Sequence, residues 1–180
     1  AVIPAILTFA VVPFGGQYEL WGTTVNLVIS DLDVGLLFVF AIASIATYGY
    51  VIAGWASNSN WSLLGSMRTA SQMISYEVTM GLTIVGVLMV FGTMKLTEIG
   101  AAQEDFLNWG FFLQPVGFFM FLAASIAENK RIPFDAPEAE SELVAGYFTE
   151  YSGLKFGMFF MAEFIEMVTI GAIVTILFFG

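Results

Sequence analysis

The chain has 180 residues, of which 58% are apolar, 16% aromatic and only 11% charged, and its net charge is −10. A soluble domain carries about 45–50% apolar and about 25% charged residues, so this composition excludes a cytosolic globular enzyme and a disordered chain. The negative charge also excludes a protein that binds nucleic acid through its phosphates. Cysteine and histidine are absent, which excludes disulfides, iron–sulfur clusters and the usual haem and zinc sites. The composition is typical of a polytopic membrane protein.

Long apolar segments succeed one another along the chain. A helix needs about 20 apolar residues to cross the hydrocarbon core of a bilayer. Four segments meet or approach this length, and a fifth looks like the end of a truncated span: residues 34–56, 73–94, 112–128 and 157–180, and residues 1–14. The sequence therefore predicts an all-α, polytopic transmembrane helix bundle, with four full spans and one truncated N-terminal span in a single membrane domain over 1–180. Because the chain begins and ends within apolar runs, we expect a fragment of a longer protein.

The basic residues are concentrated on one predicted side of the membrane. Connections that are two apart lie on the same side, so the predicted loops 57–72 and 129–156 share a side. They hold four of the five basic residues: Arg68, Lys130, Arg131 and Lys155. The excess of positive charge predicts that this side faces the cytoplasm or its equivalent.

Carboxylates lie inside the predicted spans. Glu77 lies about one turn inside 73–94, Glu128 closes 112–128, and Glu163 and Glu166 lie about two turns inside 157–180. A charged side chain at the bilayer centre costs about 2.5–3.5 kcal/mol. No matching lysine or arginine stands beside these acids on their own helices, so we expect buried, unpaired carboxyls that exchange protons. The alternatives are acids that reach the interface or that hydrogen-bond between helices, and Glu166 in particular could simply share the polar face of Glu163.

The loop 129–156 is the richest stretch of the chain. With Glu128 it carries six acids: Glu128, Asp135, Glu138, Glu140, Glu142 and Glu150. Apolar side chains such as Phe134 and Tyr147 are interleaved with them, which a solvated loop does not need. The pattern favours a functional loop that packs against the membrane or a partner over a solvated acidic loop. Arg68 either pairs with these acids or is an anchor on the positive side.

Four motifs resemble one known family, the H-subunit (mitochondrial subunit 1) family of respiratory complex I. The motifs are Gly54-Trp-Ala-Ser-Asn-Ser-Asn60, Ser75-Tyr-Glu77, Ala127-Glu-Asn-Lys-Arg-Ile-Pro-Phe-Asp135, and Pro137-Glu-Ala-Glu-Ser-Glu-Leu-Val-Ala-Gly-Tyr147, which runs on to Glu150-Tyr151. The resemblance extends along nearly the whole chain. The long acidic motif is its most specific part.

The resemblance implies a bundle of eight spanning helices, of which this chain would hold the second to the sixth. It implies a membrane subunit of a proton-translocating NADH:quinone oxidoreductase, with no complete active site on this chain alone. The implied substrate is quinone, with FMN, NADH and iron–sulfur clusters on partner subunits. The implied partners are the peripheral-arm subunits of the quinone site and small membrane-arm subunits. The implied location is a bacterial cytoplasmic membrane or, alternatively, a mitochondrial inner membrane.

The resemblance also assigns residue roles. The proton path would hold Glu77, Glu128, Glu138, Glu140, Glu142 and Glu163. The loop that faces the quinone chamber would hold Arg131, Phe134 and Asp135, with Arg68 on the same side.

Two residues depart from the family pattern, and other functions stay open. The family commonly has Glu-Thr-Asn-Arg where this chain has Glu128-Asn-Lys-Arg131, and the extra charge of Lys130 is expected to pair with a loop acid. Glu166 matches no family acid. The alternatives are the membrane subunit of an energy-converting hydrogenase or formate hydrogenlyase, a stand-alone cation transporter, and a passive anchor. Costly acids inside the spans argue against the anchor, and no inverted repeat supports the transporter.

Overall fold

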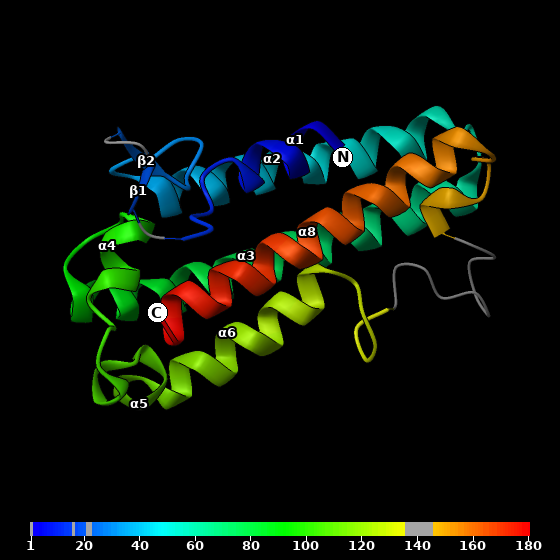
Figure 1. Ribbon diagram of the computed structural model, residues 1–180. Helices are drawn as coiled ribbons and strands as arrows, with labels where there is room; N and C mark the ends of the chain where they lie inside the picture. Colours follow the sequence, from blue (N-terminus) through cyan, green and yellow to red (C-terminus); the bar gives the residue numbers. More distant parts are fainter. Residues whose placement is uncertain (1, 16, 21–22, 136–145) are drawn as a thin grey trace.

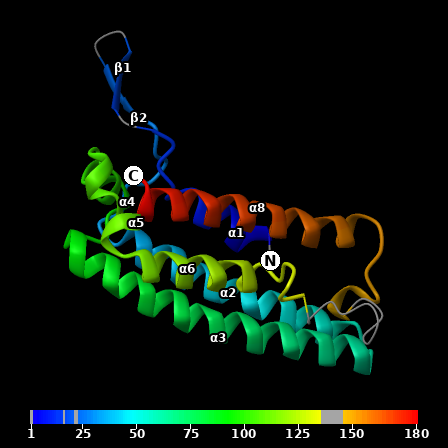
Figure 2. The same cartoon turned by 90° about the horizontal axis from the view of Figure 1, so that it is seen from below.

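The computed structural model describes residues 2–15, 17–20, 23–135 and 146–180 of the chain. Its long helices run side by side, and several short elements gather at one end of them (Figures 1 and 2). In chain order the elements are α1 (Val2–Phe9), β1 (Gln17–Leu20), β2 (Thr23–Asn26), α2 (Gly35–Ala56), α3 (Asn60–Phe91), α4 (Leu96–Ala101), the 3₁₀ helix η1 (Phe106–Asn108), α5 (Gly110–Leu113), α6 (Pro115–Glu128), the 3₁₀ helix η2 (Gly146–Phe148) and α8 (Leu154–Phe178). This architecture confirms the predicted all-α bundle. The antiparallel hairpin β1–β2 is an addition that the sequence did not predict.

The helices α1, α2, α3, α6 and α8 close a ring, since each packs against the next and α8 packs back against α1. Figure 2 shows α3 and α8 on opposite faces of the bundle, with α2 and α6 between them. Leu36, Phe121 and Leu177 belong to a large apolar cluster that fills the end of the ring near α4 and α5. A smaller cluster around Tyr50 and Tyr147 fills the other end. The core is therefore divided in two along the bundle.

The helix α3 begins at Asn60, so the prediction of a loop over 57–72 is wrong for most of that range. The turn before α3 needs only a few residues, because Asn58 adopts a φ of 52° and the Ser57 hydroxyl donates to carbonyl oxygens in the last turn of α2. The polar side chains that follow are compatible with a helix, since hydroxyls such as that of Ser66 donate to a carbonyl of their own helix. The low hydropathy here marks a polar helical segment, and Arg68 lies on a helix.

The helix α6 is too short to cross a membrane by itself. A residue before proline disfavours the helical conformation, and Gln114 before Pro115 separates α5 from α6 within the predicted span 112–128. With 14 residues and a rise of about 1.5 Å per residue, α6 is about 21 Å long, against about 30 Å of hydrocarbon. The helix α6 therefore ends inside the bundle, and the next two residues, Asn129 and Lys130, are buried there. Non-helical backbone is tolerated at such depth where protein surrounds it.

An ion pair joins two connecting segments at the end of the bundle near α4. The Lys95 Nζ lies 3.0 Å from Asp31 Oδ2 and 3.8 Å from Asp33 Oδ1. The hydrogen bond to Asp31 is the main reason that the pKa of Lys95 is raised. Lys95 therefore ties the connection before α2 to the connection after α3.

Among the described residues, α2, α3 and α8 are long and apolar enough to cross a membrane. Exposed apolar side chains form one face of α3, at Ile74, Val78, Leu82, Val85 and Met89. A stripe with this helical spacing suits contact with lipid chains or with further membrane helices. The first turns of α3, η2 and the start of α8 lie together at one end of the bundle (Figures 1 and 2), as expected if loops two apart share a side. That this is the cytoplasmic side stays a prediction.

Candidate functional site

A side chain from α3 holds the turn 129–134 that follows α6. The Gln72 Nε2 donates to the carbonyl oxygens of Ala127 and Phe134, at 2.7 Å in each case. The Phe134 ring also packs edge to face against Tyr76 of α3, with 5.5 Å between the ring centres. The helix α3 therefore fixes both the beginning and the end of this turn.

The turn places the side chain of Lys130 in the interior. Lys130 adopts a φ of 54°, which is uncommon for a residue other than glycine. Its Nζ donates to Glu163 Oε1 at 2.9 Å and to the Tyr147 hydroxyl at 3.1 Å, and lies 3.8 Å from the centre of the Tyr50 ring. The Tyr147 hydroxyl donates to the same Glu163 oxygen at 2.5 Å. Charge-assisted hydrogen bonds and a cation–π contact thus compensate the burial of two charges. We call Lys130, Tyr50, Tyr147 and Glu163 the Lys130 cluster.

The carboxylate of Glu77 lies between α2 and α3. It is half-buried and accepts a hydrogen bond from the Ser44 hydroxyl of α2. Glu77 therefore faces its neighbouring helix, as a hydrogen-bonded membrane acid is expected to do.

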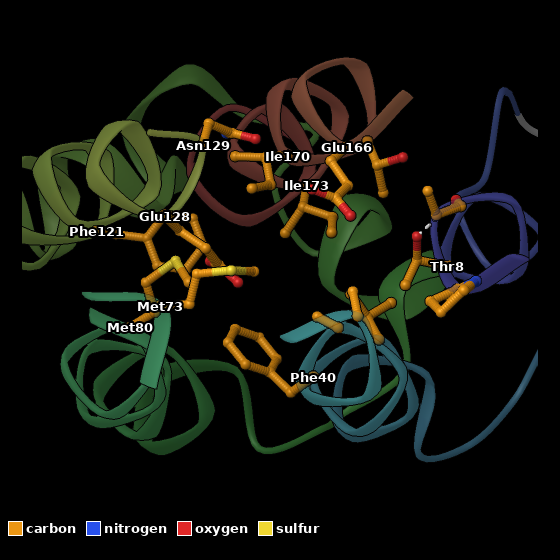
Figure 3. A pocket seen from close by; sticks show the side chains of 16 residues that line it. Thr8, Phe40, Met73, Met80, Phe121, Glu128, Asn129, Glu166, Ile170 and Ile173 are labelled. Carbon is orange, nitrogen blue, oxygen red and sulfur yellow. Dashed lines mark hydrogen bonds between the residues drawn. The ribbon is translucent and has the colours of Figure 1, made fainter. Parts of the chain in front are cut away.

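Glu128 and Glu166 face a pocket inside the ring of helices, and Figure 3 shows them reaching into it from α6 and α8. Its volume is about 50 Å³. We call it the Glu128–Glu166 pocket. Glu128 is only 8% exposed, and the Glu166 Oε1 is buried without a hydrogen-bond partner among the described residues. Glu128 also interacts electrostatically with Glu77, and Glu166 with Lys130. These interactions connect the two acids of the pocket with Glu77 and with Lys130.

The residues predicted for the quinone-chamber loop do not form one site in the structure: two of them pack against other helices and two are exposed. Phe134 is half-buried against α3, and the Arg131 guanidinium lies 5.4 Å from the ring centre of Phe164. Asp135 is exposed, and so is Arg68, on α3. Three predicted proton-path acids lie outside the described residues: Glu138, Glu140 and Glu142.

Two expectations about charge pairing are wrong. The sequence predicts an unpaired Glu163 and a Lys130 that pairs with an acid of its own loop, but the two residues pair with each other. The cause is the short length of α6, which brings the turn after it into the bundle beside α8. The sequence prediction considered only basic residues on the helix that carries the acid. The partner of Glu163 instead comes from the turn after α6.

Sequence reasoning also missed Ser44, Tyr50, Gln72 and Tyr147 as site residues. A signal was present for each, because hydroxyl and amide side chains in spanning segments commonly hydrogen-bond between helices. Tyr147 lies within the acidic motif, but its place beside Lys130 depends on how η2 packs against α3.

Replacing Gln72 by Leu is expected to destabilise the protein by about 1–2 kcal/mol, since it leaves the Phe134 carbonyl without its donor. The measurement is the thermal midpoint of the full-length protein in mild detergent. Ser71→Leu is the matched control, because Ser71 is the exposed neighbour of Gln72 on α3. Equal midpoints for the two variants would contradict the assigned role of Gln72.

Comparisons with known proteins agree on one family. A family model described as NADH dehydrogenase matches residues 1–180. The chain is similar to the first H subunit of the NADH-quinone oxidoreductase of Geobacter metallireducens, at 53% identity over 100% of this chain and 54% of the relative. It is also similar to the second H subunit of the NADH-quinone oxidoreductase of Geobacter sulfurreducens, at 52% identity over 100% of this chain and 54% of that relative. The corresponding H subunit of Syntrophotalea carbinolica is 49% identical with the same coverage. The chain spans about half the length of these curated relatives.

Proposed function

Because the chain belongs to the NADH dehydrogenase family, we propose that the full-length protein is the H subunit of a proton-translocating NADH:quinone oxidoreductase. Its substrate is a quinone. NADH, FMN and iron–sulfur clusters belong to partner subunits, namely the peripheral-arm subunits of the quinone site and small membrane-arm subunits. The protein is a multi-pass protein of a bacterial cytoplasmic membrane, and the relatives named above likewise come from bacteria.

The observation that carries this proposal is the set of carboxyls inside the ring of helices. Glu77, Glu128 and Glu163 come from three different helices. Glu128 lines the pocket, Glu77 interacts electrostatically with Glu128, and Glu163 pairs with the buried Lys130. Acids at membrane depth are costly and mark proton or ion pathways. Since interacting carboxyls titrate as a set, a proton can transfer from one of them to the next.

The turn after α6 supplies the link between the quinone side and these acids. Reduction of a quinone consumes protons and changes the local charge near the loop 129–156. Lys130 belongs to this loop and forms an ion pair with Glu163 of α8. Any movement of the loop that displaces Lys130 therefore changes the charge balance of Glu163 and its neighbours. We propose that this displacement relays quinone reduction to proton movement.

The first experiment is the purification of the tagged full-length protein in mild detergent with everything that accompanies it. The proposal predicts a large assembly that reduces quinone with NADH and is blocked by a quinone-site inhibitor. An assembly that evolves hydrogen, or a protein without any redox partner, would overturn it. Those outcomes would favour a hydrogenase subunit or a cation transporter respectively.

Replacing Glu128 by Gln is expected to slow proton translocation in sealed membrane vesicles by about tenfold or more, because an amide cannot carry the proton. Quinone reduction and proton uptake are measured separately. Glu104→Gln is the control, because Glu104 is an exposed acid near the other end of the bundle. Wild-type values for both rates in Glu128→Gln would remove Glu128 from the path.

A further inference from the structure

We infer that Glu166 is a further proton-exchanging residue, and that it exchanges protons with Glu128 through water held in the Glu128–Glu166 pocket. This deepens the proposed function, on which it rests, by adding an acid that matches no family motif in this chain.

Glu166 lies one helical turn after Glu163 on α8, and Figure 3 shows its side chain directed into the pocket. Its Oε1 has no hydrogen-bond partner among the described residues, although it is buried. Buried carboxyl oxygens in folded proteins are almost always hydrogen-bonded, to protein or to ordered water.

The pocket is large enough for water. Its volume is about 50 Å³, and one water needs about 10–15 Å³ together with two to four polar partners. Besides the two carboxyls, the pocket is lined by Thr8, Asn129 and Thr169. Each of these three donates a hydrogen bond to its own segment and keeps oxygen lone pairs free to accept from water. The remaining wall is apolar, so the polar partners that the pocket offers a water are the two acids and these three residues.

Charged and polar groups surround the two acids. Glu166 interacts electrostatically with Lys130 and Glu163, and its carboxyl is within hydrogen-bonding reach of Tyr50. Glu128 interacts with Glu166, Glu77 and Lys130. Two carboxyls that share an apolar site hold one proton between them more readily than both ionise. When the proton leaves Glu166 for a pocket water, an equivalent proton passes from that water to the Glu128 carboxylate. The number of protons and the total charge of the pocket are unchanged by this exchange.

The inference also accounts for the two departures from the family pattern. Lys130 adds a positive charge to the interior, and Glu166 adds a negative charge within its reach. When Glu166 is ionised, these two added charges offset each other. Glu166 also gives the pocket its second carboxyl.

The test uses infrared spectroscopy of the full-length protein in membranes. The carboxyl stretching band of a protonated glutamic acid can be recorded without any quinone reduction. In the wild-type protein, we expect one band, because Glu128 and Glu166 share one proton. Glu128→Gln and Glu166→Gln are each expected to shift or remove the same band, whereas Glu104→Gln leaves it unchanged. Two separate bands that respond independently to the two variants would overturn the inference.

A second variant blocks the water without touching an acid. Ala43 of α2 lines the pocket, and Ala43→Met is expected to fill it and to slow exchange of the carboxyl proton for deuterium. Ala123→Met is the control, since Ala123 lies on an exposed face of α6. Unchanged deuterium exchange in Ala43→Met would overturn the role of water. A band that disappears when sodium is added would show a cation site and would overturn the inference as well.

These measurements separate the inference from the proposed function. A protein that lacks NADH:quinone reductase activity but shows the shared band contradicts the proposed function alone. A fully active assembly whose band is insensitive to Glu166→Gln contradicts the inference alone.

Discussion

Replacing Lys130 by Met is expected to destabilise the protein by about 3–5 kcal/mol, because it leaves one partner of a buried ion pair without the other. The Lys130 side chain is fully buried, and the Glu163 side chain is only 6% exposed. Methionine keeps most of the length of the side chain but gives neither Glu163 nor Tyr147 a donor. The measurement is the thermal midpoint of the full-length protein in mild detergent, together with the fraction that assembles with its partners.

The double variant Lys130→Met/Glu163→Leu separates the charge from the packing. Replacing both members of a buried ion pair by apolar residues is often neutral or stabilising. We therefore expect the double variant to recover most of the loss in stability and none of the proton translocation. Lys95→Met is the matched control, because Lys95 also pairs with an acid but is partly exposed, and exposed pairs contribute little. A Lys130→Met protein as stable as Lys95→Met would contradict the pairing.

The sequence predicts the long helices α2 and α8 well, because both segments are predominantly apolar and of spanning length. It predicts the start of α3 poorly, since residues 60–72 mix polar and apolar side chains, and hydropathy alone does not distinguish such a helix from a loop. It also misses the division of 112–128, which depends on the single residue before Pro115. Helix boundaries thus depend on local backbone geometry that composition does not report.

The sequence predicts which acids belong to the candidate site, but it does not predict which residues pair with them. Acids inside apolar runs are visible in the sequence, and the structure buries Glu128 and Glu163 accordingly. Their functional roles stay predictions. The Lys130–Glu163 pair is beyond sequence reasoning, because it requires α6 to end inside the bundle and Lys130 to adopt a positive φ. The third contact of that cluster, from Tyr147, requires η2 to lie against α3.

The contact between α3 and η2 depends on the absence of a side chain at Gly65. A Cβ at this position would lie 2.8 Å from the Gly146 Cα and 3.1 Å from the Tyr147 nitrogen. Both are backbone atoms, so they cannot move aside as the end of a flexible side chain can. The close approach sets the position of Tyr147, whose hydroxyl joins Lys130 to Glu163.

Replacing Gly65 by Ala is therefore expected to destabilise the protein by about 1–3 kcal/mol, the usual range for overpacking a filled contact. Gly81→Ala on the same helix is the matched control, because a Cβ there meets nothing within 4 Å. In an open helical position alanine is favoured over glycine by about 1 kcal/mol, so the same substitution is expected to change stability in opposite directions at the two sites. The thermal midpoints of the two full-length variants measure this difference. A Gly65→Ala protein as stable as Gly81→Ala would show that η2 does not rest on α3, and Tyr147 would then lose its assigned place beside Lys130.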